Sequence, residues 1–506
     1  MNIVVDVVNR YGNIFLITKC KGDKAMAYKM TERMQPIFLP PIIDDYVGSQ
    51  DPVRVYDAFI EALDFKTLGI SLEPKAGADE YYPKDMLKLI VYGYSYGTRS
   101  SRKLERACHH NLSFQWLMGG GTPDYCTIAR FRSDHKEPIK KVLKQCVRMC
   151  IKFDMIDGNA LFIDGSKFRA NASINHSYTK ERAEESIQKI ERHIDDLLDH
   201  SETIDQQEDK EQSLIKVKEQ IHQQAKLINK MKNVLTELEA TSKDSINIID
   251  PGAVKAKSRQ GTHAVYNVQS TVDGKHGLIV NVDAVSQHDD SNQLNAQIQQ
   301  ATALLEHTPH HVVADARYSS VQDVKQIDSK INVIVPTLKQ AQQDKGRHPI
   351  QPFDKKYFVY DQGLDEYVCP EGKRLKFRSF SPEQNKIYQA QGAECRLCPH
   401  FGDPDSGQCT QSPAGRRVTR LADEEFKEQM EANYRKPENQ ARYQLRKEKV
   451  EHPFGHMKRN LGAGQFMLRG KAKVDAEASI LATCFNLTRM ITIMGVTNLI
   501  TKFSGT

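Results

Sequence analysis

The stretch ALFIDGSKFRANAS at residues 160–173 decides the fold, because an apolar run stops there at a single acid, Asp164, and gives way to small and basic residues. A run of this kind predicts a buried strand that ends near the acid. The next apolar stretch, residues 263–285, contains Asp273 and Gly274, a pair typical of a tight hairpin turn between two strands.

Helices and strands alternate beyond this hairpin. Residues 291–307 have the apolar spacing of an amphipathic helix, residues 310–315 form a short apolar run that ends at Asp315, and residues 331–338 form another. The order strand, hairpin, helix, strand, helix, strand predicts the α/β class, with one mixed sheet flanked by helices. We assign this core to residues 155–177 and 250–339.

Two inserts interrupt the core. Residues 178–242 are almost free of glycine and proline, and their apolar residues keep a 3,4 spacing that predicts a coiled-coil insert, either within one chain or between two chains. Residues 340–430 form a cysteine-rich β insert with short strands. The cysteines of this insert are Cys369, the C-x-x-C pair Cys395 and Cys398, and Cys409. This pattern is compatible with a structural zinc site and with plain reduced cysteines, and both interpretations stay open.

The chain before the core divides into an extended segment, residues 1–40, and a helical domain, residues 41–150. Basic residues such as Arg130 and Arg132 lie on its predicted helices. Such a domain suits DNA binding, and composition alone favours a solvated helical bundle slightly over it. Residues 431–500 are expected to supply C-terminal helices that complete the catalytic site.

Composition limits the class of protein. The chain has 506 residues, 39% of them apolar, a net charge of +6 and ten cysteines. We therefore expect no membrane span, no secretory signal and no disulfide scaffold, and we expect a cytoplasmic protein. The charge is concentrated, since residues 441–473 alone carry a net +7. A positive block of this kind favours a polyanionic partner.

Three acids carry the chemical argument. Asp164 and Asp315 each end a predicted strand, and Glu451 lies inside the positive block, with Glu448 as a fallback. The plain alternative is that the aspartates are turn or cap residues and that Glu451 forms a surface ion pair. Carboxylates on two strands and a helix also suit two Mg²⁺ or Mn²⁺ ions about 4 Å apart, in a site that cuts a phosphodiester.

The chain resembles bacterial insertion-sequence transposases of the DDE class. The resemblance covers most of residues 35–495 and rests on the order of five short motifs. These are TPDYCTIARFR, FIDGSKFRANAS, DPGAVKAKSRQGTHAVYNVQSTVDGKHGLIV, ADARYSS and VEHPFGHMKRNLGAGQFMLRG. It implies a ribonuclease H-like core in which Asp164, Asp315 and Glu451 bind the metal ions, Mg²⁺ or Mn²⁺.

The resemblance also implies a function, namely binding of the terminal repeats of an insertion sequence, strand cleavage and strand transfer. The expected partners are the element ends and target DNA, with a homodimer assembled on DNA, close to the nucleoid. In this family an arginine precedes the metal-binding glutamate at a fixed spacing. Arg446 misses that spacing to Glu451 by one residue, so Lys447 occupies the arginine-like place. The expected DNA-binding residues are Arg130, Arg132, Arg446, Lys447, Lys458, Arg459 and Arg469. A DNA-binding repressor without activity and a nuclease without strand transfer are the alternatives.

Overall fold

The computed structural model describes residues 5–8, 14–17, 42–73, 80–205, 211–241, 243–258, 261–347, 351–404 and 407–505, in two units divided after Gly48. In the first unit, strands β1 (Val5–Val8) and β2 (Ile14–Ile17) pair antiparallel, and a short 3-10 helix, η1 (Ile43–Tyr46), follows. The rest of the segment expected to be extended, residues 1–40, lies outside the described residues. All remaining elements belong to the second unit.

Seven helices form the predicted helical domain. They are α1 (Val53–Glu61), α2 (Phe65–Leu68), α3 (Pro83–Ser95), α4 (Ser101–His110), α5 (Leu112–Leu117), α6 (Tyr125–Asp134) and α7 (Lys136–Lys152). Helix α3 is the buried centre, and Pro83 starts it in the first turn, where a missing N–H costs nothing. The Asp124 carboxylate accepts the Thr127 N–H at 2.6 Å and so caps α6.

A six-stranded mixed sheet forms the core. Its strands are β3 (Ala160–Arg169), β6 (Val254–Ser258), β7 (Gly261–Asp273), β8 (Ile279–Val285), β9 (His311–Ala314) and β10 (Asn332–Ile334). The strand order is β10-β9-β3-β7. On the side of β7 away from β3, its first half pairs with β6 and its second half pairs with β8. Strands β3, β7 and β8 are antiparallel, whereas β9 and β10 run parallel to β3. The mixed α/β class is confirmed.

The hairpin between β7 and β8 differs from the tight Asp-Gly turn that we expected. Residues 274–278 form a longer connection, and the Asp273 N–H donates to the Leu278 carbonyl at 2.8 Å. The reason is that the Asp273 side chain is buried and already accepts the Gly158 and Lys275 N–H groups, each at 2.9 Å. Asp273 therefore links the segment just before β3 to the turn between β7 and β8 through hydrogen bonds.

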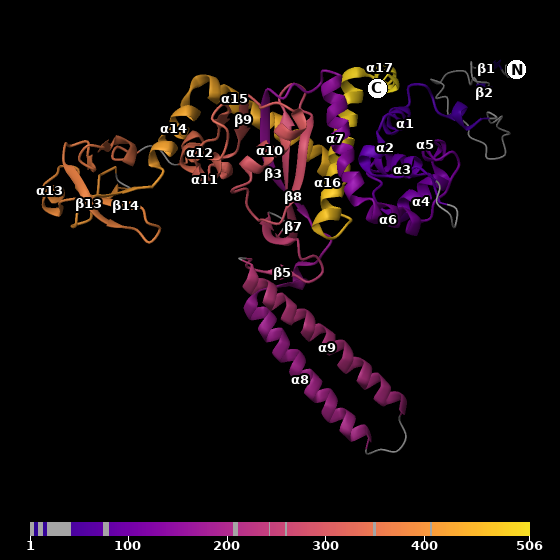
Figure 1. Ribbon diagram of the computed structural model, residues 1–506, viewed down its shortest axis with the longest axis horizontal. Helices are drawn as coiled ribbons and strands as arrows, with labels where there is room; N and C mark the ends of the chain where they lie inside the picture. The colour runs from indigo at the N-terminus through magenta and orange to yellow at the C-terminus, as the bar shows by residue number, and fades with distance from the viewer. Residues whose placement is uncertain are drawn as a thin grey trace, which may run out of the picture. The chain divides into compact units, whose positions relative to one another are not determined.

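Helices surround the sheet. Three short elements follow strand ends, η3 (Ala316–Tyr318), α11 (Val321–Val324) and α12 (Leu338–Asp344), while α10 (Leu294–Leu305) packs on β7 and β8. The C-terminal helices are α14 (Glu424–Arg435), α15 (Pro437–Arg459), α16 (Lys471–Met494) and α17 (Val496–Ser504). Helix α16 is buried against α7, α3 and β8 (Figure 1). Among the described residues no single helix suits a membrane span, and only α16 and α17 together, bent by 113°, reach that composition.

The first insert is a helical hairpin. Helices α8 (Lys180–Asp205) and α9 (Glu211–Ala240) lie side by side (Figure 1), and the turn joining them, residues 206–210, lies outside the described residues. At its base, η2 (Ile174–His176) leads into β4 (Ser177–Tyr178), which pairs with β5 (Ile246–Asn247). The two helices pair within one chain, and pairing between two chains stays untested.

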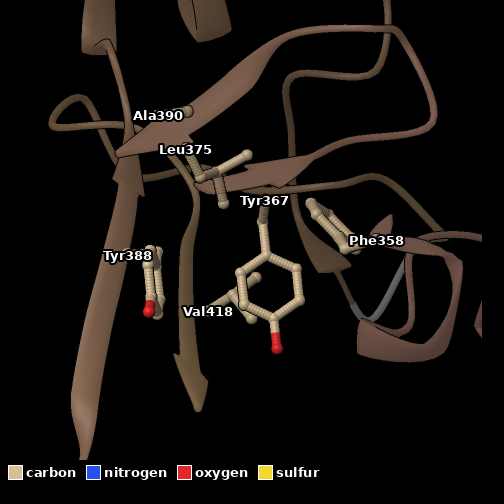
Figure 2. Packing of buried hydrophobic residues seen from close by; sticks show 6 residues of the cluster. All are labelled: Phe358, Tyr367, Leu375, Tyr388, Ala390 and Val418. Atoms are coloured by element: carbon tan, nitrogen blue, oxygen red, sulfur yellow. The ribbon is translucent and has the colours of Figure 1, made fainter. Parts of the chain in front are cut away.

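The second insert is a small antiparallel meander. Its elements are η4 (Lys355–Tyr357), β11 (Val359–Asp361), β12 (Glu366–Val368), β13 (Arg374–Phe380), β14 (Lys386–Ala390), α13 (Gly392–Arg396) and β15 (Arg417–Arg420). The five strands pair in chain order. Figure 2 shows the apolar cluster of this insert, where Tyr367 and Tyr388 lie beside Leu375 and Val418.

Candidate active site

Two of the three predicted acids lie side by side. Asp164 is inside β3, which continues to Arg169 and does not end at the acid as we expected, because its second half still pairs with β7; Asp315 directly follows β9. Because β3 and β9 are parallel, with Ile163 beside Ala314, their register places the two aspartates at neighbouring positions. The Asp315 carboxylate also accepts the Arg317 N–H at 3.3 Å and caps η3. Side chains alternate along a strand, so Asp164, Ser166 and Phe168 share one face of β3.

Helix α15 covers that face and places a cation between the aspartates. Arg446 Nη1 lies 3.4 Å from Asp164 Oδ1, and its Nη2 lies 3.5 Å from Asp315 Oδ2. These distances are longer than those of a good charge-assisted hydrogen bond. Nη1 is buried and has no hydrogen-bond partner among the described residues. The carboxylate pair therefore attracts positive charge, and Arg446 retains donor capacity that neither aspartate uses.

Burial and neighbouring charges shift the pKa values in this site. Burial raises the pKa of Asp164 to about 6, Arg446 opposes this shift, and the charge of Asp315 adds to it. Burial alone would lower the pKa of Arg446, but Asp164 and Asp315 hold it above the ordinary arginine value. The arginine is therefore charged, while Asp164 takes up a proton in mildly acidic solution.

Lys458 reaches the same face of β3 from the end of α15. Its Nζ donates to Ser166 Oγ at 2.6 Å and lies 4.6 Å from the centre of the Phe168 ring. Burial lowers the pKa of Lys458 to about 8, against the opposing charge of Asp164. The lysine thus provides a second, partly desolvated cation two residues along the strand from the first acid.

The third predicted acid is not joined to the aspartate pair. Glu451 is exposed and lines a cleft of about 620 Å³ together with Asp315, Tyr443, Arg446 and Lys447. The fallback acid Glu448 does not line this cleft. Across the part of the chain that the structure describes, no three His, Cys, Asp or Glu side chains are arranged to hold a metal ion. The oxygen ligands nevertheless suit Mg²⁺ or Mn²⁺, because a carboxylate pair that already draws in a cation fits a hard metal ion.

Two families match the chain. Residues 41–134 match a family described as "Transposase domain (DUF772)", and residues 368–491 match one described as "Transposase DDE domain". The resemblance to DDE-class insertion-sequence transposases is confirmed. The DDE match contains Glu451, Lys458 and the cysteines of the second insert, whereas Asp164 and Asp315 lie between the two matched ranges. A divalent metal ion is typical of DDE transposases.

Comparison with other proteins adds little to the family matches. No curated protein matches the chain. A solved structure, the cryo-EM structure of the piggyBac transposase synaptic complex with hairpin DNA, aligns over 90% of this chain and 79% of its own. The two chains are 9% identical with a TM-score of 0.33, which is too low to establish a shared fold.

The basic residues expected to contact DNA differ in exposure. Arg130, Lys447, Arg459 and Arg469 are exposed, and Arg469 also donates from Nε to the Asn171 carbonyl at 2.8 Å. The structure corrects the expectation that Arg132 contacts DNA, because the Arg132 side chain is buried. Its guanidinium donates to the Tyr94 hydroxyl, the Arg99 carbonyl and the Ser101 hydroxyl, so it holds the helical domain together and does not face a ligand.

Sequence reasoning missed a polar network behind Asp164. On the opposite face of β3, Asp290 Oδ1 accepts hydrogen bonds from Asn267 and Gln269, each at 2.8 Å. Tyr318, which follows Asp315 by three residues, donates to Gln269 Oε1. The network packs directly against Gly165, where an added Cβ would lie 2.2 Å from Asp290 Oδ1. Two amides at alternate positions of a buried strand were the signal, since buried polar groups require partners.

A buried ion pair fixes the loop after α15. Arg99, from the helical domain, bonds Glu477 of α16 at 2.9 Å, and it also donates to the carbonyls of Gly462 and Gln465. Glu477 in turn accepts the Met467 and Leu468 N–H groups. The loop carrying these groups is therefore held where α15, with Lys458 near its end, meets the sheet.

Proposed function

We propose that this chain is a DNA transposase that binds the ends of an insertion sequence, cuts them and joins them to target DNA. The observation that carries the proposal is the neighbouring pair Asp164 and Asp315 with a cation held between them, beside a cleft lined by Glu451. We also propose that the core is ribonuclease H-like, because β3 carries the first acid, β3, β7 and β8 each pair antiparallel with the next, and β9 and β10 run parallel to β3.

The reaction has two steps. In the first, a water oxygen attacks phosphorus at the element end, the P–O3′ bond breaks, and a 3′-hydroxyl and a 5′-phosphate result. In the second, that 3′-oxygen attacks a phosphorus of the target strand, and the target 3′-oxygen leaves with a proton. Each step exchanges one phosphodiester P–O bond, so no cofactor for redox chemistry or covalent protein intermediate is needed.

Asp164, Asp315 and Glu451 are the residues that would hold divalent metal ions. When bound, such ions supply positive charge to the phosphate in the transition state and favour ionisation of the attacking hydroxyl. The side chains of this chain do the remaining work. Arg446 would exchange the carboxylates for a DNA phosphate through Nη1, which has no hydrogen-bond partner among the described residues, and Lys458 would bind a phosphate near the cut as an ammonium ion. Exposed Lys447, Arg459, Arg469 and Arg130 would contact the DNA backbone.

Assembly follows from the reaction. Two element ends must be cut together, so we propose a homodimer assembled on DNA, acting in the bacterial cytoplasm at the nucleoid. Mg²⁺ is the expected ion, and Mn²⁺ is the substitute that the same oxygen ligands accept. The helical domain would bind the element ends, and its exposed Arg130 is a candidate contact.

A cleavage and joining assay tests the proposal. The full chain is incubated with DNA that carries the inverted repeats flanking its gene, a target plasmid and Mg²⁺. We expect nicked and joined products from the intact chain, none from Asp164→Asn, and unchanged products from Asp328→Asn, an exposed aspartate away from the cleft. Cut but never joined DNA would favour a nuclease, and tight binding without cutting would favour a repressor.

A further inference from the structure

The β insert is small for an independently folded unit. Its sheet β11 to β15 surrounds one cluster of buried side chains, and that cluster has six members within the described residues: Phe358, Tyr367, Leu375, Tyr388, Ala390 and Val418 (Figure 2). A core of this size rarely stabilises a domain without a disulfide or a metal ion. Cys369, Cys395 and Cys409 pack against this cluster, so the cysteines adjoin the place where a cross-link would help.

Four cysteines, Cys369, Cys395, Cys398 and Cys409, which we call the cysteine cluster, come from separate turns of the insert. Cys369 directly follows β12, Cys395 lies in α13 with Cys398 just beyond it, and Cys409 lies in the loop before β15. All four are free thiols. They line one cavity of about 30 Å³, together with apolar atoms of Leu375 and Phe401. A cavity needs about 10 to 15 Å³ to accept a water-sized group, so this one has room for an ion.

Backbone geometry around the cysteine cluster suits sulfur ligands. The turn after Cys369 reverses at Gly372, whose φ is +75°, and it brings the Lys373 N–H to 3.2 Å from Cys369 Sγ. Amide donors of this kind stabilise a thiolate. On the other side, Arg416 donates to the Cys409 carbonyl at 3.0 Å and places positive charge beside that cysteine.

One further ligand type adjoins the cavity. His400 lines it, but its Nε2 lies 3.3 Å from Glu371 Oε1, and its ring packs on Phe353 with centroids 4.7 Å apart. The imidazole is therefore engaged elsewhere. The four sulfur atoms surround the cavity without converging on one point, since no three of the described His, Cys, Asp or Glu side chains form a closed metal site.

We propose that the cysteine cluster binds one structural Zn²⁺ ion as four thiolates. Sulfur ligands select zinc over Mg²⁺, and four of them complete a tetrahedral sphere and leave no position for a substrate. The ion links the turn after β12, helix α13 and the loop before β15, which gives the small insert the cross-link that its core lacks. Binding releases the thiol protons, so zinc affinity rises with pH.

The test measures metal in the full-length protein. The chain is purified in reducing buffer without chelator, and zinc is counted by atomic emission against protein concentration. We expect one zinc per chain in the intact protein and in Cys126→Ser, which changes an exposed cysteine of the helical domain. We expect nearly complete loss in Cys395→Ser and Cys398→Ser. Asp164→Asn should keep its zinc, so failure at the catalytic site and failure of this proposal are distinguishable.

A second measurement covers variants that do not fold. The intact chain is stripped of metal with a chelator and reloaded with Co²⁺, which should give a thiolate-to-cobalt charge-transfer band and the intense visible bands of a tetrahedral site. Zinc below a tenth of an equivalent, a cobalt spectrum of octahedral type, or disulfides in the insert by mass spectrometry would each overturn the proposal. Equal zinc in Cys126→Ser and Cys395→Ser would place the ion elsewhere and overturn it as well.

Discussion

Replacing Asp164 with asparagine should stabilise the metal-free protein at neutral pH. Burial raises the pKa of this carboxyl group from 3.8 to about 6, even with Arg446 beside it. Each pH unit of such a shift is worth about 1.4 kcal/mol, so the ionised carboxylate costs the folded state roughly 3 kcal/mol at pH values above the folded pKa. The Asp164 side chain is 21% exposed, so this figure is an upper limit. Asparagine keeps the shape of the side chain and removes the charge.

The sign of the pH dependence follows from the direction of the shift. The folded protein holds the Asp164 proton more tightly than the unfolded chain does. The stability that this proton contributes is fully present below the unfolded pKa of 3.8 and is lost as pH rises through about 6. The advantage of the asparagine variant should therefore be largest near pH 7.5 and should nearly vanish near pH 4.

Urea unfolding followed by circular dichroism, in chelator, measures the effect at both pH values. An opposite-sign control is Asp365→Asn, because hydrogen bonds from Lys386, Tyr360 and Tyr388 lower the pKa of Asp365 to about 2. That variant should lose stability at neutral pH. Adding Mg²⁺ should stabilise the wild type and leave Asp164→Asn unchanged, since only the wild type binds the ion. A variant that is less stable than the wild type at neutral pH, or equally shifted at both pH values, would refute the reasoning.

Three further predictions concern the cations and the buried ion pair. The rate of cleavage by the intact protein should fall as pH rises through about 8. Burial lowers the pKa of Lys458 to about 8, and only the ammonium form binds phosphate. In a pH–rate profile, Lys458→Arg should remove this fall. Arg99→Met should lower the free energy of unfolding by roughly 3 to 5 kcal/mol, and adding Glu477→Leu should recover part of it, in a denaturant double-mutant cycle. Arg446→Gln should tighten Mg²⁺ binding in the absence of DNA, measured by calorimetry, since a competing cation is removed; unchanged affinity would contradict this.

Local patterns in the sequence were sufficient for much of the fold. Apolar runs that end at Asp164 and Asp315 predicted strands, and the structure has β3 and β9 there, with the acids at neighbouring positions. Heptad spacing predicted the helical insert, because that pattern depends on contacts between residues close in sequence. The register between β3 and β9 was not visible in the sequence, since it is set by packing between segments that lie far apart along the chain.

Residue roles that depend on tertiary contacts were the ones missed. Arg132 has the same sequence context as exposed Arg130, but it is buried, because hydrogen bonds to Tyr94 and the Arg99 carbonyl replace water. Charge alone therefore could not separate a structural arginine from a DNA-binding one. Asp290 was missed for a similar reason, since its partners Asn267 and Gln269 come from a distant strand.

The spacing on α15 separates Glu451 from Arg446 around the helix axis. Glu451 follows Arg446 by five positions, which rotates one side chain about 140° around the helix axis from the other. Arg446 shares a helix side with buried Val450, and Lys447 shares one with Glu451, while Arg446, Lys447 and Glu451 all line the cleft. On the proposed function, Arg446 would leave the aspartates for a DNA phosphate when a metal ion binds them, and Glu451 would join them from the same helix.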